Sequence, residues 1–162
     1  MKPGTIRTIA ICLFRDRDRL LVFEGHDSVK GDQYYRPLGG GVEFGEATQD
    51  AVAREIREEL GLEVTDLVLE RVLENRFVVD GRQGHEIVFV YSGRFVDEHV
   101  YETPVLEGRE DDGTPFRVEW RSLSAFDATH RLVPEELWEV VGQPGSLAGA
   151  RRSQGERRET IR

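Results

Sequence analysis

The chain has 162 residues, 38% of them hydrophobic and 33% charged, with a formal net charge of −9. A chain of this length and polarity is expected to form one domain with a sizeable core. The acidic balance argues against nucleic-acid binding, and no apolar run reaches the roughly 20 residues that cross a membrane. The start of the chain lacks the apolar stretch of a secretory signal, so a cytoplasmic location is expected.

The first half of the chain alternates between strand-forming and helix-forming segments. Residues 5–14 and 19–24 are expected to form two strands joined by a charged turn. Cys12, the single cysteine, lies among apolar residues of the first strand; it excludes an internal disulfide and is expected to be a buried structural thiol. Residues 25–45, rich in glycine and aromatics, are expected to be a loop, and a helix is expected over 46–60.

The second half begins with strand signals. Val64 to Val79 is rich in strand formers and ends at Asp80-Gly81, a hairpin turn signal. His85 to Phe95 carries apolar residues on both faces, so this strand is expected to be covered from both sides. Residues 98–115 are expected to form an acidic loop that leads into a further strand from Phe116 to Leu123.

The chain ends with a second helix and a tail of different composition. Leu132 to Val141 is expected to be a helix with Pro134 in its first turn. The order of elements predicts an α+β fold, an α/β/α sandwich in which a central mixed sheet lies between helices. After Gly142 the composition shifts to Gly, Ser, Pro, Gln and Arg. We therefore expect a domain over residues 1–142 and a polar, disordered tail over 143–162.

Three carboxylates of the first helix are the strongest sign of chemistry. Glu55, Glu58 and Glu59 are spaced i, i+3 and i+4, which places them on one arc of the helix. Arg54 precedes Glu58 by four residues and can neutralise part of this charge. Carboxylates that share one face are destabilising without a cation, and oxygen ligands suit Mg²⁺ or Mn²⁺. The alternative is a solvated acidic face, as in most glutamate-rich helices.

The residues around this cluster match a family pattern. The string is Gly40–x5–Glu46–x7–Arg54-Glu55-Ile56-x-Glu58-Glu59-x-Gly61-Leu62. It resembles the Nudix box, with every fixed position filled, and the flanking chain over residues 5–142 is compatible with the rest of a Nudix domain. One departure lies just before the box, where Pro37-Leu38 stands and many members have leucine-proline.

The resemblance implies an enzyme and a set of residue roles. It implies a Mg²⁺-dependent hydrolase, for which Mn²⁺ is also suitable, that cleaves a phosphoanhydride bond in a nucleoside diphosphate linked to another group. Glu55, Glu58, Glu59 and the carbonyl group of Gly40 would bind the metal. Arg54 would orient the glutamates, and Glu46 would brace the loop and helix. The partner would be a small-molecule nucleotide, and homodimers are common among proteins that resemble this one.

The identity of the catalytic base stays open at the level of sequence. In such a hydrolase the metal would make a water more acidic for in-line attack on phosphorus, and a carboxylate would accept the proton of that water. The box residues Glu58 and Glu55, with Arg54, are the first candidates for the catalytic machinery. Carboxylates outside the box are further candidates: Glu86, Glu110, Asp111, Asp112 and Glu119. Glu86 is favoured among these because it opens an apolar strand, although each is also an ordinary strand or surface charge.

Two residues ahead of the glycines are candidates for substrate binding. Arg36 can pair with a phosphate, and Tyr35, like its neighbour Tyr34, can stack on a base. A surface arginine and core tyrosines are the plain alternatives. The group beyond the diphosphate is open, with ADP-ribose, a dinucleoside polyphosphate, a nucleotide sugar and a damaged nucleoside triphosphate all compatible with the sequence.

Two other functions compete with hydrolysis. A nucleotide-sensing domain on the same fold would bind without cutting, but such a sensor has no need for all three glutamates. An isomerase of isoprenoid diphosphates, also on this fold, would need a catalytic cysteine in the pocket. Cys12, which is expected to be buried in a strand, disfavours that function.

Overall fold

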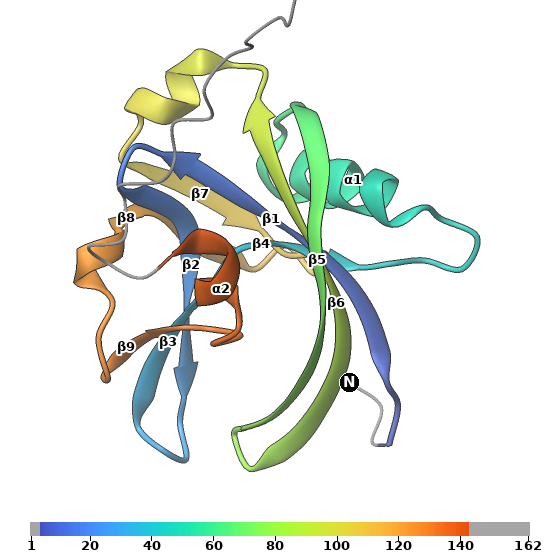
Figure 1. The fold of residues 1–162 in the computed structure, drawn as a ribbon, viewed down its shortest axis with the longest axis vertical. Coiled ribbons are helices and arrows are strands. Elements are labelled where there is room, and N and C mark those ends of the chain that lie inside the picture. The colour runs from blue at the N-terminus through green and yellow to red at the C-terminus, as the bar shows by residue number, and fades with distance from the viewer. Residues whose placement is uncertain (1–3, 143–162) are drawn as a thin grey trace, which may run out of the picture.

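Strand β1 (Arg7–Asp16) is the axis of the fold in the computed structural model, which describes residues 4–142. It pairs in parallel with β6 (Arg82–Phe95) and in antiparallel fashion with β4 (Leu38–Gly41). At its end it pairs with β2 (Arg19–Asp27) across a tight turn. β1 therefore links the two halves of a mixed, nine-stranded sheet within the described residues (Figure 1).

The remaining strands extend these two halves. On the β6 side, β5 (Val64–Val79) forms the outer strand. On the β2 side lie β3 (Asp32–Arg36), β7 (Val105–Arg109), β8 (Pro115–Ser122) and β9 (His130–Leu132). The helical elements are α1 (Thr48–Leu60), α2 (Leu137–Val141) and the 3₁₀ turns η1 (Glu98–Glu102) and η2 (Leu123–Ala125).

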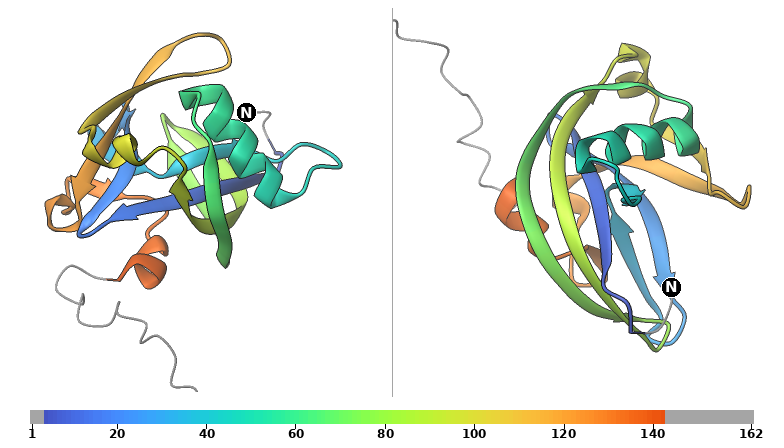
Figure 2. Two further views of the ribbon diagram at one scale, coloured as in Figure 1. Left: turned by 90° about the horizontal axis from the view of Figure 1, so that it is seen from above. Right: turned by 90° about the vertical axis from the view of Figure 1, so that its right-hand side faces the viewer.

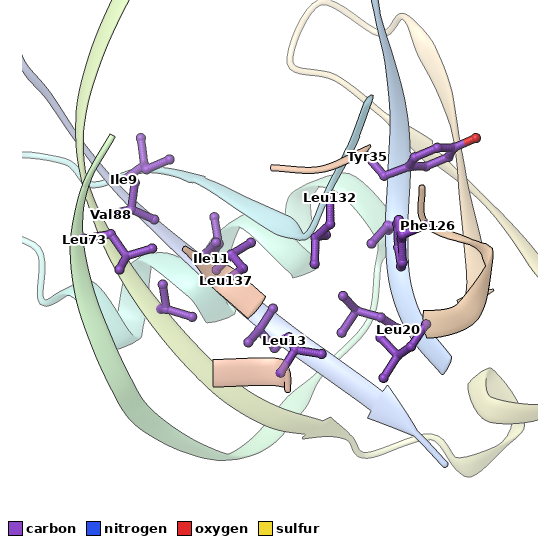
Figure 3. Packing of buried hydrophobic residues seen from close by; sticks show 14 residues of the cluster. Ile9, Ile11, Leu13, Leu20, Tyr35, Leu73, Val88, Phe126, Leu132 and Leu137 are labelled. Atoms are coloured by element: carbon purple, nitrogen blue, oxygen red, sulfur yellow. The ribbon is translucent and has the colours of Figure 1, made fainter. Parts of the chain in front are cut away.

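The two helices cover opposite faces of the sheet (Figure 2). Alternation along β1 sends Ile9, Ile11 and Leu13 to the face covered by α2, where they form one core cluster (Figure 3). The intervening residues, including Ala10 and Cys12, belong to a second cluster under α1. The expected sandwich of a mixed sheet between helices is confirmed.

Helix α1 and the hairpin after it follow their sequence signals. The helix buries Ala51, Val52 and Ile56 and ends at Gly61, whose φ of 67° allows its N–H to bond the carbonyl of Arg57. The β5–β6 hairpin turns at Asp80-Gly81, where φ is 51° and 72°. Both angles are positive, as the turn predicted from this dipeptide requires.

Three segments differ from expectation. The expected loop 25–45 holds β3 and β4, and the expected acidic loop 98–115 holds η1 and β7. The second helix begins at Leu137 instead of Leu132, because residues up to Leu132 pair with β3 and Pro134 follows. The residue before a proline avoids the helical region, which delays the start of the helix.

The tail 143–162 lies outside the described residues. Within residues 4–142, no helix is both long and apolar enough to cross a membrane.

Candidate active site

Arg54 on α1 is the centre of the carboxylate cluster. Its Nη1 lies 3.0 Å from Oε1 of Glu55 and 3.1 Å from Oε2 of Glu58. The side chain of Glu55 is 13% exposed, whereas that of Glu58 is 47% exposed. One guanidinium nitrogen therefore holds two carboxylates whose mutual repulsion would otherwise separate them.

The same guanidinium holds the loop that precedes the helix. Arg54 donates from Nε and Nη2 to the two carboxylate oxygens of Glu46, at 2.8 and 3.0 Å. Nη2 also donates to the carbonyl of Gly41 at 2.8 Å. Glu46 in turn accepts from the backbone N–H of Glu43, and its hydrogen bonds with Arg54 lower its pKa. The glycine strand, the loop and the helix are thus tied together by one partly buried network of charged hydrogen bonds.

Gly40 leaves room for the carboxyl group of Glu55. A Cβ built at residue 40 would lie 2.4 Å from Cδ of Glu55 and 2.6 Å from each of its oxygens. At the preceding residue, Gly39, φ is 143° and a Cβ would lie 2.1 Å from the carbonyl oxygen of Ala10. The backbone of β4 therefore approaches both β1 and the carboxylate more closely than any side chain permits.

Glu59 is the carboxyl group of the three that Arg54 does not contact. No residue among those described donates a hydrogen bond to its carboxylate. Burial, together with the negative charges of Glu55, Glu110, Asp111 and Glu58, raises the pKa of Glu59 to about 8. Burial likewise raises the pKa of Glu55, even though Arg54 acts against this shift. Full ionisation of these carboxyl groups is therefore unfavourable unless a further cation is present.

The donor set fits a hard divalent cation, but it is not assembled as a closed cage. No three or more His, Cys, Asp or Glu side chains within residues 4–142 lie close enough together to hold a metal ion. Arg54 bonds to both Glu55 and Glu58, and the half-exposed Glu58 can turn only by giving up its bond to Arg54. Oxygen ligands and surplus negative charge suit Mg²⁺ or Mn²⁺, which would require Glu58 to turn toward the other two carboxylates.

The candidate carboxylates outside the box differ in how close they lie to α1. Glu110 and Asp111, where β7 leads into β8, are close enough to α1 for their charges to raise the pKa of Glu59, and burial raises the pKa of Glu110 itself. Asp112 instead accepts a backbone hydrogen bond from Thr114. Glu119 lies on β8 beside Arg121 at 3.6 Å. Glu110 and Asp111 are therefore the two whose charges reach the glutamates of α1.

Glu86 has a different setting. It is 1% exposed, on β6, and it projects from the same face as Val88 and Val90, which is the face that α2 covers. Its Oε2 lies 3.4 Å from Nη2 of Arg36, and its Oε1 lies 3.7 Å from Nη1 of Arg7. The structure places Glu86 beneath two arginines and not among the carboxylates of α1.

The two residues expected to bind substrate lie in different surroundings. Arg36 lines a cavity of about 340 Å³ between the β2–β3 hairpin, β5 and the segment before α2. Tyr34, Asn75 and Phe77 line the same cavity. Tyr35 is 3% exposed, and the guanidinium of Arg121 lies 4.2 Å above its ring. The expectation that Tyr35 can stack on a base is corrected, because alternation along β3 turns it into the core.

The geometry of the box agrees with a comparison against protein families. A family model described as NUDIX domain matches residues 4–141. The chain belongs to the Nudix family. Membership supports a pyrophosphohydrolase activity on small-molecule nucleotides, and Nudix hydrolases generally use divalent metal ions. A comparison with curated proteins finds no match.

Solved structures of other Nudix proteins share the fold. A MutT NUDIX hydrolase from Burkholderia pseudomallei is 22% identical, covering 76% of this chain and 88% of that one, with a TM-score of 0.55. A NUDIX hydrolase from Nitrosomonas europaea is 21% identical, covering 76% and 74%, with a TM-score of 0.52. A UDP-X diphosphatase is 16% identical, covering 87% and 63%, with a TM-score of 0.51. At these identities the likeness establishes the fold.

Some residues near the Nudix site were not predicted from the sequence. Arg7 reaches Glu86 only because β1 and β6 pair in parallel with these two residues opposite each other. Asn75 and Phe77 look like ordinary residues of β5, and only the approach of the β2–β3 hairpin makes them cavity walls. The position of Glu86 in an apolar strand is a signal for such a residue, because a buried glutamate requires a cationic neighbour.

Proposed function

We propose that this Nudix protein is a Mg²⁺-dependent hydrolase that cleaves a phosphoanhydride bond in a nucleoside diphosphate derivative. The observation that carries the proposal is the pairing of Glu55 with the bare backbone of Gly40, next to Glu58 and Glu59 on the same helix. These are the residues that would hold Mg²⁺ or Mn²⁺, together with the Gly40 carbonyl. The ion would supply charge neutralisation at the phosphates and a more acidic water.

The chain's own residues have distinct parts in this mechanism. Arg54 fixes Glu55 and Glu58 relative to the glycine strand through its bonds to Glu46 and Gly41. A carboxylate must accept the proton of the attacking water. Within the box, Glu58 and Glu55 remain candidates for that role. Outside the box, Glu110 and Asp111 are further candidates, since their charges act on Glu59.

A cation is needed for electrostatic reasons as well. The substrate carries the dense negative charge of a diphosphate, and the chain has a net charge of −9. Without a cation the uncompensated carboxylates of α1 would repel the phosphates. The exposed position of Glu58 lets the ion enter from solvent without unfolding any element.

The decisive experiment is a panel of diphosphate substrates incubated with and without Mg²⁺. ADP-ribose, dinucleoside polyphosphates, nucleotide sugars and oxidised nucleoside triphosphates are scored by the products that appear. The proposal predicts a nucleoside monophosphate and a phosphorylated remainder from at least one class, only with the metal. Tight nucleotide binding without turnover of any substrate would instead identify a sensing domain.

The printed names of the similar structures suggest where to begin. One relative is a UDP-X diphosphatase and another a MutT hydrolase, so nucleotide sugars and nucleoside triphosphates are the first members of the panel. A cytoplasmic location and a homodimer stay predictions, which fractionation and sedimentation measurements would test.

A further inference from the structure

Glu86 is a buried charge whose position depends on two arginines. Its side chain is 1% exposed, and the side chains of Arg7 and Arg36 are 43% and 27% exposed. Removing a carboxylate from water costs several kcal/mol unless cations stand beside it. Among the described residues, these two guanidinium groups are the cations that form ion pairs with Glu86.

The two arginines retain most of their hydrogen-bonding capacity. A guanidinium has five N–H donors in a planar fork. The contacts to Glu86, at 3.4 and 3.7 Å, are long, and neither arginine forms an ion pair with any other acid of the described residues. The group of three carries two positive charges and one negative charge. A net positive charge with free donors, on the accessible side of a buried acid, is suited to bind an anion.

The arginine pair lies between the glycine strand and the cavity. Nη2 of Arg7 lies 4.0 Å from the position that a Cβ on Gly41 would occupy. Gly41 directly follows Gly40, which contacts Glu55 of the box, and one residue advances a strand by only about 3.3 Å. On its other side Arg36 lines the cavity that also contains Tyr34, Asn75 and Phe77. β4 pairs with β1 alone among the described strands, and at its second edge the carbonyl of Gly41 accepts a hydrogen bond from Arg54 of the box.

We propose that Arg7 and Arg36, oriented by Glu86, form an anion site for the phosphate of the substrate that the metal does not hold, and that the group attached to this phosphate occupies the cavity. This inference rests on the proposed function and refines it. Glu86 is then a positioning residue, because it touches the arginines and not the reacting atoms. Its burial on the α2-covered face favours this positioning role over that of proton acceptor, for which Glu86 is a candidate at the level of sequence.

The kinetic test uses the substrate that the panel identifies. Arg7→Gln and Arg36→Gln should each raise KM about tenfold or more with little change in kcat, since a charged hydrogen bond contributes about 1.5–3 kcal/mol. Glu86→Gln keeps the shape of the side chain and should raise KM by a smaller factor, while the acidic limb of the pH–kcat profile persists. In the Arg7→Gln/Arg36→Gln background, adding Glu86→Gln should have no further effect on KM.

A binding test separates this inference from the proposed function. Calorimetry with inorganic pyrophosphate in EDTA measures anion binding without metal or turnover. Binding by the full chain should be lost in Arg7→Gln and Arg36→Gln but retained in Arg94→Gln, which removes an exposed charge at the far end of β6. If no substrate is cleaved but this pattern holds, the hydrolase proposal fails and the anion site stands.

Two results would overturn the anion site. One is hydrolysis by the wild type together with unchanged KM and unchanged pyrophosphate binding in both arginine variants. The other is a Glu86→Gln enzyme that loses kcat and its acidic limb at unchanged KM, which would make Glu86 the base. If the double arginine variant unfolds because Glu86 is left unpaired, the single variants and the triple variant, which buries no charge, still decide the question.

Discussion

The backbone of Gly40 and the carboxyl group of Glu55 are in such close contact that a β-carbon at residue 40 would lie 2.4 Å from Cδ of Glu55. Gly40→Ala should therefore push this carboxylate out of place while the strand keeps its pairing. A displacement of about 1 Å costs on the order of a hundredfold in rate. We expect a loss of that size in kcat/KM, with the melting temperature little changed.

The neighbouring glycine offers a matched comparison for this variant. A Cβ on Gly41 would meet only Nη2 of Arg7, at 4.0 Å, which is ordinary van der Waals distance. Gly41→Ala should therefore lose no more than a few-fold in kcat/KM. Equal losses in the two alanine variants would contradict the steric argument for Gly40.

Glu58 should be essential for turnover and nearly irrelevant to stability. Its side chain is 47% exposed and its partner is Arg54, so Glu58→Gln should alter the free energy of unfolding by about 1 kcal/mol at most. If Glu58 binds the metal, kcat should fall by several orders of magnitude. The control is Glu63→Gln, which removes an exposed acid paired with Arg57 just beyond the same helix and should retain full activity.

The stability of the metal-free protein should depend on pH through Glu59. Its pKa is raised from 4.5 to about 8 in the folded state, so the folded protein resists ionisation of this group. The destabilisation is absent below about pH 4.5, grows as the pH rises, and is complete above about pH 8. In EDTA, Glu59→Gln should stabilise the fold by about 1–3 kcal/mol at high pH, allowing for partial exposure.

Glu59→Gln should be no more stable than the wild type at low pH. Denaturant titrations of wild type and Glu59→Gln near pH 4 and pH 9 give the comparison directly. A gain that is equal at both pH values would show that the amide packs better and that ionisation is not the cause. Added Mg²⁺ should favour the wild type at the higher pH, because the ion neutralises the carboxylate of Glu59.

Cys12 should be chemically inert in the native state. It is fully buried under α1, and burial raises the pKa of its thiol well above the usual range. We expect no reaction with a thiol reagent until denaturant unfolds the chain. Rapid labelling of the native protein would place this sulfur in an accessible pocket and would revive the isomerase alternative.

The box was predictable from sequence because its information is local. The spacing of Glu55, Glu58 and Glu59 and the stop at Gly61 fix which side chains share a face of α1, and the structure shows this arrangement. The bond from Arg54 to Glu58 follows from the same helical spacing. The Asp80-Gly81 turn was likewise predictable from the dipeptide alone.

The other side of the site depends on pairings between distant segments. Arg7 and Glu86 meet through the parallel register of β1 and β6, for which the sequence carries no local signal. β3 was missed because Asp32 to Arg36 lacks an apolar alternation, and tertiary pairing with β2 and β9 overrides its weak propensity. The position of Glu110 near α1 arises from the β7–β8 hairpin, which no spacing rule predicts.

Titration of the metal-free chain with Mn²⁺, followed by electron paramagnetic resonance, tests the central claim most directly. The account predicts that the wild type binds Mn²⁺, that added Mg²⁺ competes for the same place, and that a folded chain with glutamine at residues 55, 58 and 59 loses this binding. Equal Mn²⁺ uptake by the wild type and the folded triple variant would contradict it, because the ion would then be held elsewhere.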